Sequence, residues 1–495
     1  MLFSSIDFAI FLPIVFVLYW LVLNKNLQVQ NLLLLTASYV FYCWWDWRFL
    51  FLLITLSIIN YFVGIRINDN GIDKRRRIWL GIALFINIGA LCVFKYFNFF
   101  IDSFIDLISL IGYDLPRSTT RIILPVGISF YIFISLSYLL DVYKRTINVN
   151  RKFFEVLLCF GFFPVILAGP IQRPSSLIPQ IKKKREFNYA QAVDGLRQIL
   201  WGLFVKIVIA DNLAGYVDDY FLNYTDYMGS TLFFGAVFYT IQIYADFSGY
   251  SDIAIGTAKL FGFELMRNFA YPYFSRDIND FWKRWHISLT TWFRDYIFLP
   301  LSFKISWRLR GEKVFYIKTD IFIYIVSSII TWFLTGLWHG ANYTFIIWGM
   351  IHGVVLIVYH IQRKPRNRLL KKNGISNNNF LIIVFETTIT LCIVIIAWIF
   401  FRSENIGQAL NYIAGIFSSS SSAISESLQI DQLLAPTILV VGFIFVEWLG
   451  LDQQYAFARL GSKFKRPVRY AMYLAMFISI LLFGGNGQQF IYFQF

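Results

Sequence analysis

Long apolar runs recur along the whole of this chain of 495 residues. A helix needs about 20 mostly apolar residues to cross the hydrocarbon core of a bilayer, and soluble domains seldom carry many such runs. Hydrophobic residues make up 58% of the chain, and the mean hydropathy is +0.59. We therefore predict an all-α, polytopic membrane protein that forms a single integral-membrane domain over residues 1–495. About twelve spans are expected, at roughly 7–23, 31–46, 49–65, 78–98, 122–143, 190–211, 230–247, 321–338, 343–359, 380–401, 432–450 and 470–486.

The net charge of +15 comes from basic clusters in the short loops between these runs. This clustering follows the positive-inside rule for cytoplasmic loops and differs from the basic surface of a nucleic-acid-binding domain. If the N-terminus is outside, every large basic cluster is cytoplasmic and the acidic stretches 217–220 and 403–431 are outside. We predict that both termini are outside, that the protein contacts membrane lipids, and that it has no nucleic-acid partner. The basic clusters lie at 74–77, 144–145, 182–185, 304–318, 363–372 and 463–469.

Four segments differ from simple spans. The run from Leu157 to Pro170 leads directly into a basic loop, so we expect a re-entrant hairpin packed inside the protein. The run from Ile253 to Phe263 is too short to cross and is expected to be re-entrant or interfacial. Phe99 to Leu115 is expected to form an amphipathic surface helix, and Ser418 to Ser422 a flexible loop. The first run lacks a basic segment before it and a small-residue cleavage site after it, which indicates a retained span rather than a signal peptide.

Three of the four histidines lie between Asp280 and Gly353. His339 stands between two of the expected spans, where an ionisable side chain is costly to bury and therefore usually functional. A neutral imidazole can act there as a general base or a nucleophile. The alternative is a structural histidine that is hydrogen-bonded between helices.

The residues next to His339 fit either role. Gly336 and Gly340 would let backbone or substrate approach closely. Trp338 precedes the histidine and is a candidate substrate-binding residue, while Asn342 could orient the ring or donate to an oxyanion.

The other histidines are weaker candidates. His286 lies in a stretch, 280–299, that we expect to form an interfacial helix with one aromatic face and one charged face. His352 follows His339 by thirteen residues, about 220° around an ideal helix, so the two need not share a site. We expect His352 to have a structural or supporting role and His360 to be a loop residue.

A polar island from Asp246 to Asp252 ends the expected span 230–247. Asp246, Ser248 and Tyr250 are candidate substrate-binding residues, although capping of a helix break would explain them equally well. Arg173 could meet the phosphates of a cytosolic donor, but orientation in the membrane also explains basic residues in this region.

Several kinds of site are not indicated by the sequence. There is no HExxH motif and no Cys/His cluster at ligand spacing, so no metal site is expected. There is also no P-loop or GxGxxG fingerprint, which argues against an ATP-driven pump. The cysteines lie singly in apolar runs, at Cys43, Cys92, Cys159 and Cys392.

Five sequence blocks, in this order, resemble those of the membrane-bound O-acyltransferase (MBOAT) family, in its bacterial branch that acts in polysaccharide O-acetylation. Together they place the core motifs at about 120–360. The blocks are Leu124–Tyr131 with Asp141–Tyr143, Ala168–Arg173, Gln242–Asp252, Asp280–Tyr296, and Leu337–Ala341 with Trp348-Gly and His352-Gly.

The resemblance implies a ring of tilted helices around a central tunnel in a thinned region of the membrane. It makes His339 the family's catalytic histidine and places His286, with its neighbours Arg284 and Trp285, at a second family histidine. His339 would activate an acceptor hydroxyl or take the acyl group itself, and His286 would help to position the donor. Asn342 and the polar island at 246–252 would orient groups along the tunnel.

The resemblance also implies an activity. An acetyl group would move from cytosolic acetyl-CoA, used as a substrate with no bound cofactor, towards an extracytoplasmic polysaccharide such as alginate-like exopolysaccharide or peptidoglycan. An extracytoplasmic acyltransferase of the SGNH-hydrolase type would be the partner, and the location would be the bacterial cytoplasmic membrane. One alternative is transfer of D-alanine from a carrier protein to teichoic acid. A polysaccharide or lipid transporter is another, although such transporters usually show internal repeats, and we find none here.

Overall fold

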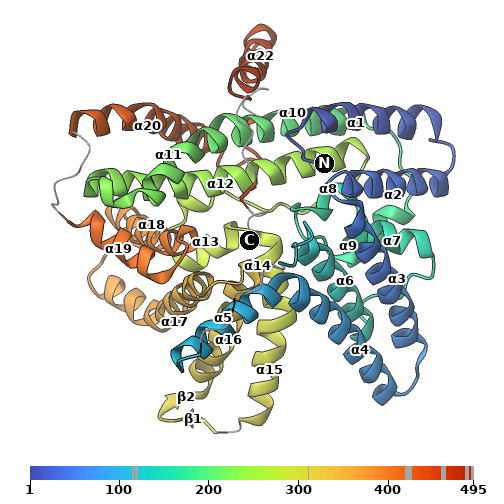
Figure 1. The fold of residues 1–495 in the computed structure, drawn as a ribbon, viewed down its shortest axis with the longest axis horizontal. Helices are drawn as coiled ribbons and strands as arrows, with labels where there is room; N and C mark the ends of the chain where they lie inside the picture. The colour runs from blue at the N-terminus through green and yellow to red at the C-terminus, as the bar shows by residue number, and fades with distance from the viewer. Residues whose placement is uncertain are drawn as a thin grey trace. The chain divides into compact units, whose positions relative to one another are not determined.

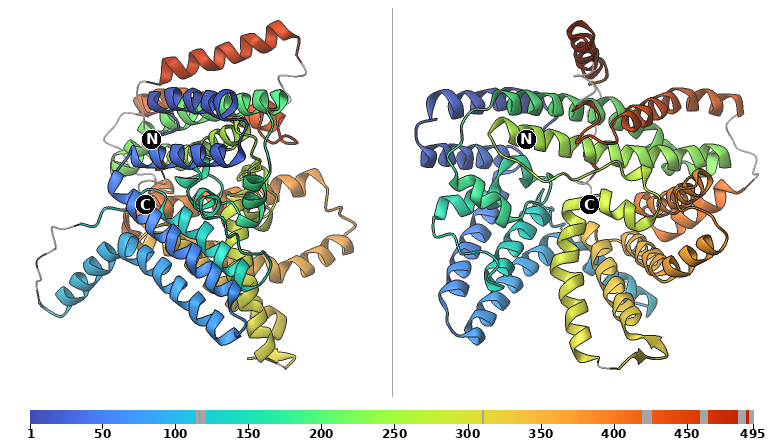
Figure 2. Two further views of the ribbon diagram at one scale, coloured as in Figure 1. Left: turned by 90° about the vertical axis from the view of Figure 1, so that its right-hand side faces the viewer. Right: turned by 180° about the vertical axis from the view of Figure 1, so that it is seen from behind.

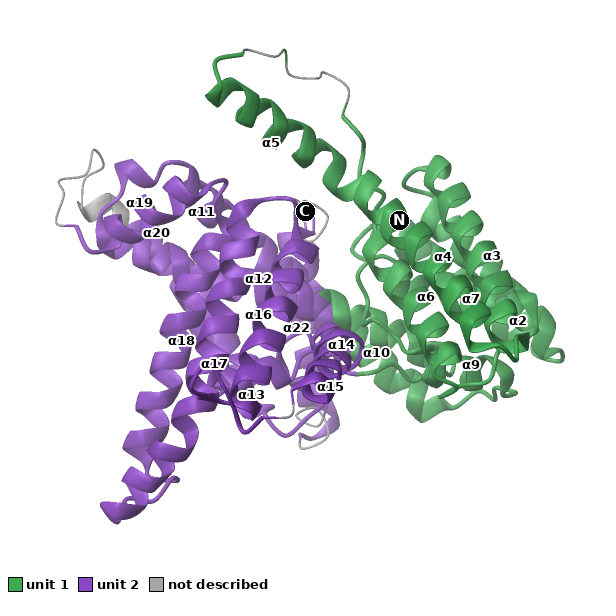
Figure 3. Ribbon diagram, turned by 90° about the horizontal axis from the view of Figure 1, so that it is seen from below, with its two compact units in different colours: residues 1–199, 250–266 green, residues 200–249, 267–495 purple. Residues whose placement is uncertain are grey.

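The structure, a computed structural model, describes residues 1–113, 116, 121–309, 311–418, 426–458, 464–484 and 490–491. Nearly all regular structure in this part is helical, so the predicted all-α class is confirmed. The strands described are β1 (Lys313–Val314) and β2 (Ile317–Lys318), which pair antiparallel in a short hairpin. The chain divides into two compact units, one made of residues 1–199 and 250–266 and the other of residues 200–249 and 267–495 (Figure 3).

The membrane character of the chain is confirmed, while the number of spans stays a prediction. In the described part, eight helices are long and apolar enough to cross a membrane, and two shorter apolar helices lie at Ile6–Val22 and Ile128–Tyr143. The eight are Trp47–Asp69, Asp73–Leu110, Tyr189–Leu222, Thr319–His339, Tyr343–Lys372, Phe380–Arg402, Asp431–Leu449 and Arg466–Phe483.

The first unit is built from the N-terminal helices (Figure 3). Helix α3 packs against α4 and α6, and two buried amides, Asn60 and Asn87, exchange hydrogen bonds of 3.0 and 2.7 Å between α3 and α4. Its elements are α1 (Ile6–Val17), the π-helical η1 (Leu18–Val22), α2 (Leu27–Cys43), α3 (Trp47–Asp69), α4 (Asp73–Leu91), η2 (Cys92–Tyr96), α5 (Phe97–Leu110), α6 (Ile128–Tyr143), α7 (Phe153–Gly161), α8 (Phe163–Ile166), α9 (Pro174–Lys182) and the start of α10 (Tyr189–Phe204).

The second unit contains all four histidines. Helices α15 and α16, joined by the β1–β2 hairpin, lie side by side and project together (Figures 1 and 2). The elements are η3 (Val205–Ala210), α11 (Asp211–Leu222), η4 (Tyr224–Asp226), α12 (Gly229–Leu260), η5 (Pro272–Phe274), α13 (Ile278–Arg284), α14 (Ile287–Phe293), η6 (Arg294–Phe298), α15 (Leu299–Arg308), α16 (Thr319–His339), α17 (Tyr343–Lys372), α18 (Phe380–Arg402), α19 (Ile406–Ile416), α20 (Glu426–Leu449) and α22 (Arg466–Phe483). The last residues of α12 belong to the first unit.

Glycines bring α16 and α17 into close contact. A side chain at Gly336 would collide with the carbonyl oxygen of Phe345, and one at Gly349 would collide with the carbonyl oxygen of Trp332. Backbone-to-backbone approach of this kind is what small residues allow between membrane helices. These glycines therefore serve helix packing, one of the two purposes that the sequence indicated for Gly336.

Two expected segments are wrong in detail. Ile253 to Leu260 is not a separate re-entrant piece but the end of α12, a single helix of 32 residues. The stretch 280–299 is not one helix, because it breaks at Trp285 and His286 into α13 and α14. The neighbouring segment takes up backbone hydrogen bonds at the break, from Ala270 N–H to the Arg284 carbonyl and from Ile287 N–H to the Asn268 carbonyl. The aromatic face of 280–299 is buried in protein, where a surface helix would have exposed it.

Other segments agree better with expectation. The run 157–170, which contains the end of α7 and all of α8, is buried inside the first unit, as expected of a segment packed in protein. In the described part of 99–115, α5 has one buried residue, Ile105, and is a surface helix of that unit.

Two remaining predictions have other outcomes. His360 lies within α17 and stacks on Tyr324, so the prediction that it is a loop residue is wrong. Of the expected Ser418–Ser422 loop, all but the first residue lie outside the described part.

Candidate functional site

His339 is the last residue of α16 and is buried, with 4% of its surface exposed. Its ring centroid lies 4.8 Å from that of Trp338, 4.7 Å from that of Trp348 on α17, and 5.1 Å from that of Phe401 on α18. All three rings meet the imidazole edge to face. Three helices of the second unit thus enclose the histidine in aromatic side chains.

His286 sits at the break between α13 and α14 in a left-handed conformation, with φ of 41°. Its Nδ1 atom lies 3.0 Å from Oδ1 of Asn268, and the same oxygen accepts a hydrogen bond of 2.9 Å from the Ser288 hydroxyl. An amide oxygen can only accept, so Nδ1 carries the proton and Nε2 carries the lone pair. Asn268 therefore fixes both the orientation and the tautomer of the ring.

The protonation state of His286 follows from its burial. The side chain is completely buried, and burial lowers the pKa of His286 from 6.5 to about 3 because a charged imidazolium is poorly solvated there. The ring is therefore neutral at physiological pH.

A single indole connects the two candidate histidines. Trp338 lies 6.1 Å from His286 and 4.8 Å from His339, measured between ring centroids. Trp348 makes a second connection, because it lies 4.7 Å from His339 and 5.0 Å from His352. The three histidines therefore belong to one aromatic cluster, which we call the histidine cluster and define as His286, His339 and His352 with Trp338 and Trp348.

His352 is fully buried in this cluster, and its Nδ1 accepts a hydrogen bond of 3.4 Å from the Trp282 indole. The expectation that it need not lie near His339 assumed one continuous helix. The chain instead leaves α16 at His339 and starts α17 at Tyr343, which brings both histidines against Trp348.

A cavity of about 410 Å³ lies beside the cluster, within the second unit. Trp282 and Trp332, which line it, both contact the His352 ring, at 4.9 and 5.8 Å. The hydroxyls of Thr331 and Thr335 on the α16 wall are turned back to helix carbonyls, so that wall is largely apolar. Among the described residues, no group of three or more His, Cys, Asp or Glu side chains could hold a metal ion.

Three other candidate residues, Trp285, Arg284 and Asn342, differ in their contacts. Trp285 is buried and lies 4.9 Å from Trp398 in the surrounding aromatic core. Arg284 forms an ion pair of 3.0 Å with Asp280. Asn342 caps α17 by accepting from Thr344 N–H, and it also donates to a backbone carbonyl at residue 404, so both ends of its amide are engaged away from His339.

The polar island lies inside a continuous helix, so the suggested helix-break capping is wrong. Asp246 is 2% exposed, forms an ion pair of 2.6 Å with Lys206 and accepts a hydrogen bond of 2.7 Å from Ile491 N–H. Ser248 is also buried. Tyr250 and Arg173 belong to the other unit, where Tyr250 contacts Phe3 and Arg173 precedes α9.

The same region of the chain matches a known family. The model of the MBOAT, membrane-bound O-acyltransferase family, matches residues 149–401. The chain belongs to the membrane-bound O-acyltransferase family. It is therefore an enzyme of acyl transfer and a multi-pass membrane protein, and the transporter hypothesis is not needed.

Individual family members differ in similarity. The probable alginate O-acetylase AlgI of Pseudomonas putida is 35% identical, with the whole of both chains covered. The peptidoglycan O-acetyltransferase of Helicobacter pylori is 33% identical over 82% of this chain and 77% of that protein. The teichoic acid D-alanyltransferase of Bacillus subtilis is 28% identical over 48% of this chain and 60% of its own length.

For three residues at or near the site, no role was predicted from the sequence. Asn268 lies eighteen residues before His286 and no spacing rule joins them. Trp348 and Trp398 are two of many tryptophans in apolar runs, yet their buried indole N–H groups have no hydrogen-bond partner among the described residues. Only the fold shows that Trp348 contacts the catalytic candidate His339 and that Trp398 packs against Trp348, with the two indoles 5.7 Å apart.

Proposed function

We propose that this O-acyltransferase moves an acetyl group from cytosolic acetyl-CoA to O-acetylate an extracytoplasmic polysaccharide, with His339 as the central catalytic residue. The observation that carries the assignment of the site is the placement of His286 and His339 against one indole, Trp338. The acetyl group is supported by the relatives, since those from P. putida and H. pylori are named for O-acetylation. The acceptor class follows from the same names.

In the proposed reaction, a neutral His339 accepts the proton of the acceptor hydroxyl as its oxygen attacks the thioester carbonyl. An oxygen–carbon bond forms, the carbon–sulfur bond breaks, and the proton passes from the imidazole to the leaving thiolate. The products are an ester and a free thiol. In the alternative order, His339 takes the acyl group first and the hydroxyl then displaces it.

The surroundings give the other residues their proposed roles. His286, neutral and fixed by Asn268, would present Nε2 to the donor, and Trp338 would hold the two histidines at a set separation. The apolar cavity beside the cluster would receive the thioester arm. Arg173, Arg284 and Trp285 are further residues that we propose to act on the donor side.

We also propose an arrangement of the protein in the membrane. Twelve spans around a central tunnel, in one domain, would place both termini outside the bacterial cytoplasmic membrane. The basic loops would then face the cytosolic donor. An extracytoplasmic acyltransferase of the SGNH-hydrolase type would complete the transfer to the polysaccharide.

The test uses purified full-length protein in vesicles supplied with labelled acetyl-CoA and a polysaccharide acceptor. Wild type is compared with His339→Ala and with His360→Ala, a matched control because His360 is exposed and stacks on Tyr324 outside the cluster. We expect wild type and His360→Ala to release free CoA, and His339→Ala to lose at least about a hundredfold in rate, as for loss of a general base. Thermal unfolding checks that each variant is folded.

Two results would contradict the proposal in different ways. If folded His339→Ala releases CoA at the wild-type rate, the catalytic assignment is wrong. If wild type leaves acetyl-CoA intact but consumes a D-alanyl carrier protein, the acetyl donor is wrong while the histidine remains testable with the new donor.

A further inference from the structure

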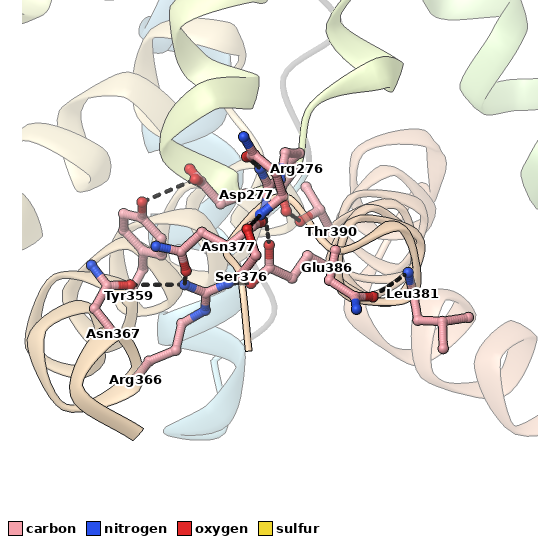
Figure 4. Close-up of polar contacts among 12 residues, drawn as sticks. Arg276, Asp277, Tyr359, Arg366, Asn367, Ser376, Asn377, Leu381, Glu386 and Thr390 are labelled. Atoms are coloured by element: carbon pink, nitrogen blue, oxygen red, sulfur yellow. Dashed lines mark hydrogen bonds and ion pairs between the residues drawn. The ribbon is translucent and has the colours of Figure 1, made fainter. Parts of the chain in front are cut away.

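A second cavity, polar and of about 350 Å³, lies in the second unit and shares only Asn279 and Lys283 with the apolar cavity described above. Figure 4 shows its central contacts, which join the segment before α13, the later part of α17, the following loop and the first turns of α18. Four cationic side chains line it: Arg276, Lys283, Arg363 and Arg366.

The three carboxylates that line the cavity already have partners. Glu386 lies between Arg276, at 3.0 Å, and Arg366 (Figure 4). Asp277 accepts from the Tyr359 hydroxyl at 2.9 Å and from the backbone N–H of Asp280 at 2.8 Å. Asp280 itself forms an ion pair with Arg284, which does not line the cavity.

The remaining cations are not balanced. Lys283 and Arg363 have no ion-pair partner among the residues that the structure describes, and both are exposed. Glu386 is a single carboxylate for two arginines. The cavity therefore carries excess positive charge, and amide groups of Asn279, Asn367 and Asn377 add hydrogen-bond donors. An anion with several oxygen acceptors fits such a lining.

The position of the cavity along two candidate spans indicates where that anion comes from. Arg363 follows Tyr343, the first residue of α17, by twenty residues, about 30 Å along the helix axis and thus about one hydrocarbon thickness. Glu386 lies in the second turn of α18, the next candidate span. Because the chain turns between the two spans, the cavity lies at a membrane face.

The two helices that contribute to the cavity also carry exposed apolar side chains at this level of the chain. Val358 and Ile361 of α17 are each 43% exposed, and Phe385 of α18, next to Glu386, is 66% exposed. Exposed apolar groups of this size on candidate spans are expected to contact lipid chains. A basic cavity lined by two such helices is suited to a lipid headgroup, because the exposed apolar surface of the same helices can contact the lipid chains.

We propose that this cavity binds the phosphate headgroup of an anionic phospholipid, with Lys283 and Arg363 as its ligands and Glu386 holding Arg276 and Arg366 in place. Lys283 lies on α13, three residues before His286. A bound lipid therefore fixes the helix that leads into the histidine cluster. This binding does not depend on which acyl donor or acceptor the enzyme uses.

The test measures lipid binding to the delipidated full-length protein in neutral detergent. Phosphatidylglycerol is titrated and followed by thermal unfolding and by native mass spectrometry. Phosphatidylcholine, inorganic phosphate and CoA serve as comparison ligands. Wild type is compared with Lys283→Gln/Arg363→Gln and with Lys371→Gln/Lys372→Gln, a control that removes the same charge from exposed positions outside the cavity.

We expect phosphatidylglycerol to bind wild type and the control variant equally and more tightly than phosphatidylcholine. In Lys283→Gln/Arg363→Gln its dissociation constant should rise about 25-fold, or about five-fold for each cation removed. If that double variant does not fold, Lys283→Gln alone should show the five-fold effect.

Three outcomes would overturn the proposal. The cavity variant could bind phosphatidylglycerol like wild type, which means the lipid does not bind there. Both double variants could lose the same affinity, which means only general surface charge is involved. Finally, the binding of inorganic phosphate or CoA could require Lys283 and Arg363 while the binding of phosphatidylglycerol does not. The cavity would then be a site for a soluble phosphate compound.

Discussion

A single buried cation holds two carboxylates in the second unit, and its removal gives the sharpest test of the structure. The ammonium of Lys206 lies 2.6 Å from Asp211 and 2.6 Å from Asp246. The three side chains are only 5%, 8% and 2% exposed. Water therefore cannot replace the lysine if it is removed.

Lys206→Met keeps the length of the side chain and removes its charge. Deleting one partner of a buried ion pair typically costs about 3–5 kcal/mol because the other charge stays buried and uncompensated. Two carboxylates lose their cation here, so we expect the upper end of that range. Asp246→Asn should cost less, about 1–3 kcal/mol, because the pair between Lys206 and Asp211 remains and the amide oxygen can still accept from Ile491 N–H.

The assay is reversible unfolding of the detergent-solubilised protein, followed by tryptophan fluorescence. Lys183→Met, at an exposed position, is the matched control and should change the free energy of unfolding by less than about 0.5 kcal/mol. The triple variant Lys206→Met/Asp211→Asn/Asp246→Asn should recover much of the loss, because no charge is left buried. An unchanged unfolding free energy for Lys206→Met would refute the burial argument.

Two further predictions concern the site and the helix pair that carries it. The pKa of His286 is lowered to about 3 in the folded protein, so between pH 6.5 and 3 only the unfolded state gains a proton, and stability falls by about 1.4 kcal/mol per pH unit as the pH is lowered. Lowering the pH from 7.5 to 5.5 should therefore destabilise wild type by about 1.4 kcal/mol more than His286→Gln, whereas His360→Gln should match wild type. Gly336→Ala should lower the unfolding free energy by about 1–3 kcal/mol because the new methyl group would collide with the Phe345 carbonyl oxygen. Gly442→Ala is the control and should have no such effect, because nothing lies within 4 Å of a methyl group at that position. Equal effects of the two substitutions would contradict the close packing of α16 and α17.

Much of the fold could be predicted because hydropathy is a local signal. Each of the twelve expected spans overlaps helical residues in the described part, and the expected ends of 321–338 and 380–401 agree with those of α16 and α18 to within two residues. Hydropathy was less informative where polar residues interrupt an apolar helix. The island at 246–252 reads as the end of a span, yet Lys206 neutralises Asp246 and lets α12 continue.

The break at His286 could not be predicted from helical periodicity. A wheel over 280–299 places the aromatic residues on one face, and they are indeed buried. The backbone nevertheless leaves the helix there, because the segment at 268–270 offers hydrogen bonds that a continuous helix would not make. Tertiary contacts of this kind override local preference and leave no trace in spacing.

The same limit applies to the site, and it explains why the histidines were easier to find than their partners. A histidine in an apolar run is conspicuous because burial of an ionisable group is costly, so His339 stands out without any fold. An asparagine in a loop is not conspicuous, yet Asn268 decides which nitrogen of His286 holds the proton. An indole is equally ordinary in a membrane protein, yet Trp338 sets the separation of the two histidines. A catalytic residue can therefore be recognised in the sequence when it is costly to bury, as His339 is. The residues that orient it, such as Asn268 and Trp338, can be recognised only in the fold.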